Sequence, residues 1–446
     1  MASTEHEDSG QQAPGVGVSP DPAPEQSPVE DALVATATPA VVNSLGEYTG
    51  VWLKRVRSGE SGVLPVVVGL IIIVIYFQSQ NSVFLSASNL VNLMTQAAFL
   101  ITFGMAEVFV LLLGEIDLSV GYNAAIGAVI TLWMLSLSHP FPLWLAILAG
   151  LAFSAAFAGI EGVIVTAFGL PSFVVTLAGY LGGYGLLLFL IDVAAPSSGG
   201  TIRLNNSILI DIEYGSLSAA ASWIVMIVVV VLTAAYMITR DTRRRANKLA
   251  APPASVTLLK IALMAAVGVA VVLISNVNRA VTAAAVIEGV PWAVLVILAL
   301  LVLWTVLLNR TRFGRYIYAI GGNAEAARRA GINLSRIRIY AFLLCGLTAG
   351  LTGLIYSSNL QSISNNFNGG QYVLYAVAAA VIGGTSLFGG RGSMVGAVLG
   401  GLVVAVIFNG LEILGLGAAA QNIWSAFVLL AAVLVDALAR RSRTAR

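Results

Sequence analysis

The sequence has 446 residues, of which 58% are hydrophobic and 10% are charged, and its formal net charge is +2. Soluble domains average about 25% charged residues, so this composition excludes an ordinary soluble domain, and the near-neutral charge gives no indication of a nucleic-acid partner. The single cysteine, Cys345, excludes an intrachain disulfide, and no Cys/His cluster has the spacing of a metal site.

Residues 1–60 differ from the rest of the chain because they are rich in Pro, Ser, Ala and acidic residues. Such a segment cannot bury enough apolar surface to fold alone. It also lacks the basic start, apolar core and cleavage site of a signal peptide. We therefore predict a disordered cytoplasmic N-terminal tail.

The remaining apolar residues fall in runs of about 20, the length with which a helix crosses about 30 Å of hydrocarbon. The sequence thus predicts an all-α, polytopic membrane protein, with a transmembrane domain at 61–439 and a basic cytoplasmic tail at 440–446. The twelve predicted spans are 62–80, 90–113, 121–138, 142–168, 171–192, 218–239, 256–276, 289–308, 336–358, 371–387, 393–415 and 420–438.

Basic residues gather in four clusters and predict the orientation, because short cytoplasmic loops are enriched in Lys and Arg. With twelve spans all four clusters lie on the cytoplasmic side, so both termini are predicted to be cytoplasmic and the connection 193–217 to face outward. The clusters are Lys54, Arg55 and Arg57; Arg240, Arg243, Arg244, Arg245 and Lys248; Arg310, Arg312, Arg315, Arg328, Arg329, Arg336 and Arg338; and Arg440, Arg441, Arg443 and Arg446.

An internal repeat is visible in two glycine-rich stretches, each of which follows one span and opens the next. Transporters are often built from such repeats, with the substrate path at the repeat interface. Whether the repeat is parallel or inverted stays open, as does a chance match between glycine-rich segments. At one constant offset, Gly114, Leu118, Gly121, Gly127, Ala128 and Val129 recur as Gly383, Leu387, Gly390, Gly396, Ala397 and Val398.

The loop between the eighth and ninth spans predicts a short helix on the cytoplasmic face. Gly321 and Gly322 break the preceding element, and Asn323 can cap a new helix through its side-chain oxygen. Glu325 then lies in the first turn, where the helix dipole favours an anion, and Gly331 is a plausible end. Small side chains on this helix would let another protein approach closely; the alternative is an ordinary solvated basic loop. The residues assigned to the contact are Gly321, Gly322, Asn323, Glu325, Ala326, Ala327 and Gly331.

This loop resembles the coupling helix of the ABC permease family that imports ribose, xylose and related monosaccharides. Three further stretches, 114–121, 170–179 and 383–393, resemble that family's signature loop, the entry to its fifth span and its late glycine loop. The resemblance covers roughly 62–438. Glu115 and the Pro-Ser-Phe form at 171–173 favour the xylose-type branch. Two departures are an extra pair of spans near 240–290, beyond the family's usual ten or so, and Glu161-Gly162 where Asn-Gly is common.

The resemblance implies a permease subunit in the cell membrane that moves a monosaccharide and has no catalytic residues. The chain contains no Gly-x-x-x-x-Gly-Lys-Ser/Thr loop, so ATP and its Mg²⁺ would bind a separate ABC ATPase that contacts the helix at 321–332. Its other implied partners are an extracytoplasmic sugar-binding protein, a second permease copy and membrane lipid. No cofactor and no metal is expected in this chain.

Polar groups inside the bilayer are candidates for the substrate path or its gates, because an unpaired one is costly there. Ser119 and Thr176 could instead bond to helix backbone, and Asp117 could cap a helix. Glu107, Glu161 and Glu412 could pair internally or lie near an interface. The candidates are Asp117, Ser119, Asn123, Thr176, Asn409 and Gln421.

Three other functions stay open on the sequence alone. Carboxylates such as Glu107 and Asp117 would suit a proton relay in a transporter driven by an ion gradient. Within the ABC class, the substrate could be a branched-chain amino acid or a nucleoside. A membrane enzyme is the third, although the sequence shows no nucleophile–base pair for it.

Overall fold

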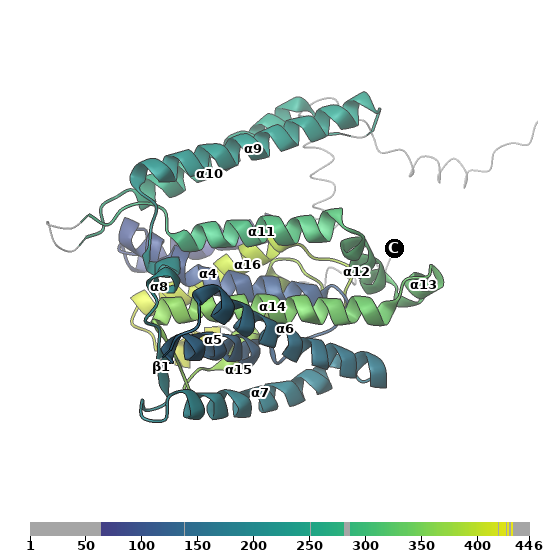
Figure 1. The fold of residues 1–446 in the computed structure, drawn as a ribbon. Coiled ribbons are helices and arrows are strands. Elements are labelled where there is room, and N and C mark those ends of the chain that lie inside the picture. The colour runs from purple at the N-terminus through teal and green to yellow at the C-terminus, as the bar shows by residue number, and fades with distance from the viewer. Residues whose placement is uncertain are drawn as a thin grey trace, which may run out of the picture.

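The computed structural model describes residues 64–137, 139–249, 251–280, 286–417, 419–424, 426–427 and 430. Within them the chain is helical apart from one pair of short strands (Figure 1). The helices are α3 (Leu64–Gln80), α4 (Ala87–Leu111), α5 (Val120–Ser136), α6 (Leu143–Phe168), α7 (Ser172–Ala194), α8 (Ser207–Tyr214), α9 (Ala219–Ala246), α10 (Ala254–Ser275), α11 (Trp292–Arg310), α12 (Arg312–Gly322), α13 (Ala324–Arg329), α14 (Leu334–Leu360), α15 (Gly369–Ile382) and α16 (Met394–Ile413), and the strands are β1 (Thr201–Arg203) and β2 (Ser362–Ser364).

Short polar residues set where several of the long helices begin. The side chains of Ser86, Ser218 and Ser393 accept hydrogen bonds from backbone N–H groups in the first turns of α4, α9 and α16. Such caps satisfy donors that an α-helix leaves unpaired at its start. At the other end of α6, Gly169 adopts the left-handed conformation, with φ of 63°, and the chain turns at once into α7.

Eleven of the twelve predicted spans coincide with helices in the described part of the chain. Eight of these helices are long and apolar enough to cross a membrane, whereas α3, α5 and α15 are apolar but shorter. The twelfth predicted span, 420–438, lies largely outside the described residues, so the count of twelve stays a prediction. The N-terminal tail at 1–60 and the basic tail at 440–446 also lie outside the described residues.

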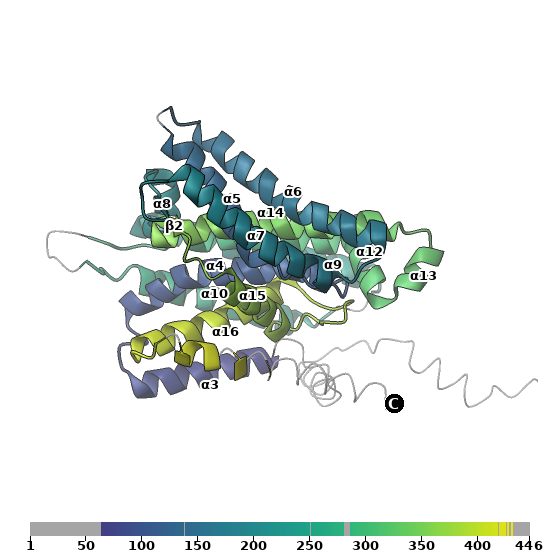
Figure 2. The same ribbon diagram turned by 90° about the horizontal axis from the view of Figure 1, so that it is seen from below.

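Helix α4 runs through the centre of the bundle and packs against α14, α15 and α16. Of its most apolar stretch 83% is buried, compared with 72% for α16 and 67% for α14. Helices α5 and α6 pack on the far side of α14, and α7 covers α5 (Figures 1 and 2). The main core therefore forms around α4 and α14, from Phe103, Phe109 and Phe342 among others.

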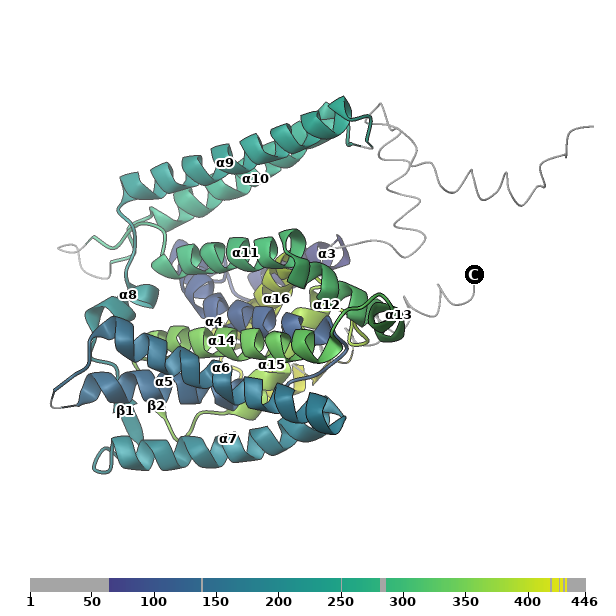
Figure 3. The same ribbon diagram turned by 45° about the vertical axis from the view of Figure 1, so that its right-hand side comes forward.

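Helices α9 and α10 form a hairpin that stands apart from this bundle (Figure 3). Only 6% and 11% of their most apolar stretches are buried within the chain. Asp241 ties the two helices together by accepting a hydrogen bond from Thr257 at 2.8 Å. The two helices, Ala219–Ala246 and Ala254–Ser275, lie at the predicted spans 218–239 and 256–276, and Pro252 and Pro253 lie in the turn between them.

The bundle has two distinct ends. At the strand end, β1 pairs antiparallel with β2, with Ile202 opposite Ile363, and α8 lies beside them. At the α13 end lie α12, α13, the two glycine loops and the C-terminal end of α9, which carries Arg243, Arg244 and Arg245 (Figure 1). The basic clusters of the described residues therefore gather at one end.

Candidate functional site

The connection between α11 and α14 contains two helices, of which the sequence predicted only the second. Thr311 caps α12 by accepting a hydrogen bond from the Gly314 N–H at 3.2 Å. Ile317 and Ile320 are buried on one side of α12, while Arg315 is exposed on the other. The apolar residues Phe313, Ile317 and Ile320 follow helical spacing, which is the signal that could have identified α12 from the sequence.

Helix α13 lies at the predicted position. The Asn323 side chain accepts a hydrogen bond from the Ala326 N–H at 2.9 Å, and Ala327 is buried on the inner side. Glu325 forms ion pairs with Arg328 and Arg329 at 2.9 and 3.0 Å, and these arginines hold the pKa of its carboxyl below the ordinary value. All three side chains are exposed, so the pairs contribute little to stability and the charges remain available to a partner.

The junction between α12 and α13 touches both glycine loops through backbone. The Gly390 N–H donates to the Leu112 carbonyl oxygen at 2.9 Å. A methyl group at Gly321 would lie 1.8 Å from that same oxygen and 2.4 Å from the Gly390 nitrogen, so only hydrogen fits. One at Gly389 would lie 2.9 Å from the Gly114 nitrogen. The α12–α13 junction is therefore in direct backbone contact with the loops after α4 and α15.

A buried acidic cluster lies where the first glycine loop enters α5. The Ser119 hydroxyl lies 2.7 Å from Asp117 Oδ1 and 2.9 Å from Glu161 Oε2. The Asp117 N–H donates to Glu107 Oε1 at 3.2 Å, and the Cys345 thiol lies 3.5 Å from Asp117 Oδ2. The structure thus brings Asp117 and Ser119 together with Glu107 and Glu161, two of the three glutamates that the sequence left unassigned. The third, Glu412, lies apart and accepts a hydrogen bond from Gln96 at 3.2 Å.

The other predicted path residues are also engaged inside the chain. The Asn123 amide donates to the Ser154 carbonyl at 3.0 Å, and the Thr176 hydroxyl lies within hydrogen-bond distance of the Ile116 and Ser172 carbonyls. Asn409 lies apart from this group and exchanges hydrogen bonds with Asn89 at 2.9 and 3.0 Å. Gln421 is half-buried, whereas the other five candidates are buried.

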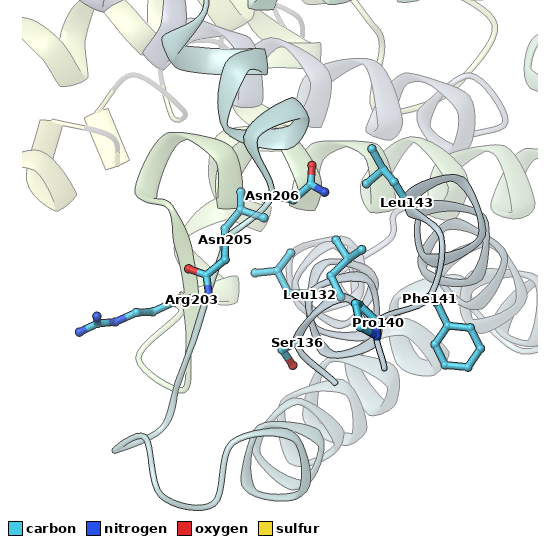
Figure 4. A pocket seen from close by; sticks show the side chains of 10 residues that line it. Leu132, Ser136, Pro140, Phe141, Leu143, Arg203, Asn205 and Asn206 are labelled. Atoms are coloured by element: carbon cyan, nitrogen blue, oxygen red, sulfur yellow. The ribbon is translucent and has the colours of Figure 1, made fainter. Parts of the chain in front are cut away.

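A cavity of about 220 Å³ opens at the strand end, between the end of α5, the start of α6 and the segment after β1 (Figure 4). Its wall combines apolar residues with the polar side chains of Ser136, Asn205 and Asn206. The Arg203 side chain extends away from the centre of the cavity in Figure 4. None of the predicted site residues lines it.

Comparison with known proteins identifies a family and several full-length relatives. Residues 89–244 and 253–436 match a family model described as branched-chain amino acid transport system / permease component. The xylose transport system permease protein XylH of Escherichia coli K12 is 33% identical over 85% of this chain and 92% of its own length. XylH of Haemophilus influenzae is 32% identical over 86% and 98%, and the ribose import permease protein RbsC of Bacillus subtilis 168 is 32% identical over 86% and 95%. No solved structure matches the chain.

Proposed function

This chain belongs to the ABC-importer permease family that includes the xylose and ribose permeases, and from that premise we propose that it carries a pentose such as xylose through the cytoplasmic membrane. It is a non-catalytic transport subunit. The proposed energy source is a separate ABC ATPase that binds α13, and an extracytoplasmic binding protein would deliver the sugar. A second copy of the permease would complete the path.

The observation that carries this proposal is the backbone contact between the α12–α13 junction and both glycine loops. An ATPase that pushes α13 would move Gly321 against Leu112 and Gly390. The loop after Leu112 carries Asp117 and Ser119 into α5, and the loop around Gly390 leads into α16. Motion at the surface thus reaches two helices of the bundle, as alternating access requires.

The predicted path residues fit this scheme as gate residues. Asp117 and Ser119 connect the moving loop to Glu161 of α6, and Thr176 of α7 contacts the same loop through the Ile116 carbonyl. We propose that these hydrogen bonds keep the loop closed until α13 moves. Asn123 and Asn409 would hold α5 and α16 in place beside it, and Gln421 after α16 is the remaining candidate for the path.

Orientation follows from the basic residues. The α13 end carries the arginine clusters of the described residues, and such clusters favour the cytoplasmic side. We propose that this end is cytoplasmic, that both termini lie there, and that the strand end receives the binding protein. We also propose that the chain has twelve spans and that the two glycine loops are the two copies of an internal repeat.

The test is reconstitution of the permease in vesicles with its ATPase and binding protein. Uptake of labelled xylose should require ATP and both partners, and an imposed proton or sodium gradient should not replace ATP. Transport driven by an ion gradient alone would overturn the mechanism. Preferred uptake of leucine or a nucleoside over every pentose would instead overturn the substrate, and the family description makes the branched-chain amino acid the second candidate.

A further inference from the structure

Helix α15 is too short to cross the membrane. Its 14 residues extend about 21 Å at 1.5 Å per residue, compared with about 30 Å of hydrocarbon. Its last residue, Ile382, leads into the glycine loop at the α13 end. Its first residue, Gly369, therefore lies within the membrane thickness, against Gly121 in the first turn of α5. The chain between β2 and α15 must descend to this depth from the strand end.

That descending chain is rich in side-chain amides. We define residues 365–371, Asn-Asn-Phe-Asn-Gly-Gly-Gln, as the amide segment. Phe367 is buried and anchors it, whereas Asn366 and Asn368 are exposed on the surface of the chain. Non-helical backbone at membrane depth occurs only where protein buries it or where it lines a water-filled cavity. The Asn365 N–H donates to the Gly200 carbonyl oxygen beside β1, so the amide segment begins at the strand end and the exposed amide of Asn366 lies near that end, where the path would open to water.

An aromatic side chain of α7, Tyr180, lies next to Gly370 of the amide segment. The rings of Tyr180 and Tyr184 lie 4.9 and 5.0 Å from the ring of Tyr122, which in turn lies 6.3 Å from Phe367. A methyl group at Gly370 would lie 2.6 Å from the Tyr180 hydroxyl, so the two elements touch. Tyr184 is 40% exposed.

The hydrogen bonds distinguish the side chains that hold this surface together from those whose polar groups have no partner in the described part of the chain. The Asn368 side chain caps α15 by accepting from the Gln371 N–H at 3.2 Å, and the Gln371 amide donates to the Tyr375 hydroxyl and to Asn422. Within the described residues, neither the Asn366 side chain nor the Tyr184 hydroxyl makes a hydrogen bond, and the Tyr184 ring contacts the ring of Tyr122. Asn366 and Tyr184 are therefore the groups that remain available to a ligand.

We propose that Asn366 and Tyr184, held by the amide segment and α7, contact the sugar in the translocation path; this inference rests on the proposed function. A monosaccharide is neutral, presents hydroxyl groups that an amide can bind as both donor and acceptor, and has an apolar ring face that an aromatic side chain can cover. Four of the predicted path residues are buried and hydrogen-bonded within the chain: Asp117, Ser119, Asn123 and Thr176. We therefore assign the contact with substrate to Asn366 and Tyr184.

The first test is ATP-driven xylose uptake by the complete reconstituted complex. Asn366→Ala and Tyr184→Ala should each lower uptake about fivefold to tenfold, the loss expected for one net contact with substrate, while the ATPase activity of the complex persists. Tyr76→Ala is the matched control, because Tyr76 on α3 is similarly exposed at 48% and lies away from this surface, and its uptake should equal that of the wild type. Wild-type uptake by both Asn366→Ala and Tyr184→Ala would overturn the inference.

The second test is labelling with a hydrophilic thiol reagent. The native Cys345 is fully buried, so introduced cysteines report on their own surroundings. Asn366→Cys should react quickly and be protected by xylose, whereas Leu232→Cys on α9, at a position 65% exposed toward lipid, should react slowly. Equal slow reaction of the two would overturn the inference. If the wild-type complex takes up no sugar, the proposed function itself is wrong, and the assignment of a sugar to this surface is wrong with it.

Discussion

Ser119 has a single hydroxyl hydrogen but lies within hydrogen-bond distance of two carboxyl groups. It can donate to one of them, so the other must carry a proton and donate to the hydroxyl oxygen. Asp117 Oδ1 also accepts the Ser119 N–H at 2.8 Å, which marks Asp117 as the acceptor and Glu161 as the protonated partner. These hydrogen bonds join the glycine loop after α4 to Glu161 of α6.

Glu213, on α8 outside the long helices, gives a pH-dependent prediction. Burial raises the pKa of its carboxyl well above the ordinary value of 4.5. A raised acid pKa means that the folded state binds the proton more tightly, so its contribution to stability is complete below pH 4.5 and is lost as pH rises toward the folded-state pKa. Glu213→Gln should remove this decline, which amounts to at most about 1.4 kcal/mol per pH unit.

The measurement is the thermal unfolding midpoint of purified protein in detergent between pH 5 and 8. Asp211→Asn is the control, because Asp211 lies on the same helix and is exposed. The stability advantage of Glu213→Gln over the wild type should grow with pH, and that of Asp211→Asn should not. An advantage that shrinks with pH would contradict the burial of an uncharged Glu213.

At the scale of elements, the α12–α13 junction joins a surface helix to two loops inside the bundle. Its two glycines have opposite surroundings: a methyl group at Gly321 would strike backbone of Leu112 and Gly390, while one at Gly322 would meet nothing within 4 Å. Backbone cannot yield as a flexible side chain can. The contact between α13 and the loops therefore depends on Gly321 in particular.

Gly321→Ala and Gly322→Ala form a matched pair of variants that test this contact. Gly321→Ala should lower ATP-driven uptake at least tenfold because it separates α13 from the glycine loops, and Gly322→Ala should keep nearly all of it. Uptake is normalised to the amount of permease in the membrane, and ATPase capture by each variant is measured in parallel. Equal uptake by the two variants would show that the close contact at Gly321 plays no part in coupling.

At the scale of the whole molecule, the bundle has a strand end and an α13 end, and among the described residues the helices around α4 and α14 are the ones most fully buried by the chain itself. The hairpin of α9 and α10 leaves most of its apolar surface uncovered, as membrane lipid permits. The basic clusters at the α13 end then define which side of the membrane each surface meets.

Cysteines placed at the two ends should show opposite accessibility. Ala326 on α13 and Asn205 beyond β1 are both exposed, and the native Cys345 is buried. A membrane-impermeant thiol reagent should label Asn205→Cys in intact cells and Ala326→Cys only in inverted vesicles. Labelling of Ala326→Cys from outside would reverse the orientation and remove the proposed site of the ATPase.

Local patterns in the sequence were sufficient to predict eleven apolar helices of the described residues and the short helix α13. Apolar runs require helices in a membrane, because no other open structure satisfies its backbone there, and Asn323 and Glu325 mark a helix start through short-range bonds. The sequence did not predict α12, which lies within the predicted loop between the eighth and ninth spans. It also could not show that α9 and α10 stand apart from the bundle, because that depends on tertiary packing.

What the sequence by itself determined is the class of protein, the helices and the family motifs, because these depend on composition and on neighbours along the chain. Tertiary structure alone decided that Gly321 meets Leu112 and Gly390, that Glu161 shares Ser119 with Asp117, and that the amide segment lies beside Tyr180. Those contacts join residues far apart in the sequence, and they exist only because the packing around α4 and α14 brings separate helices to the same depth.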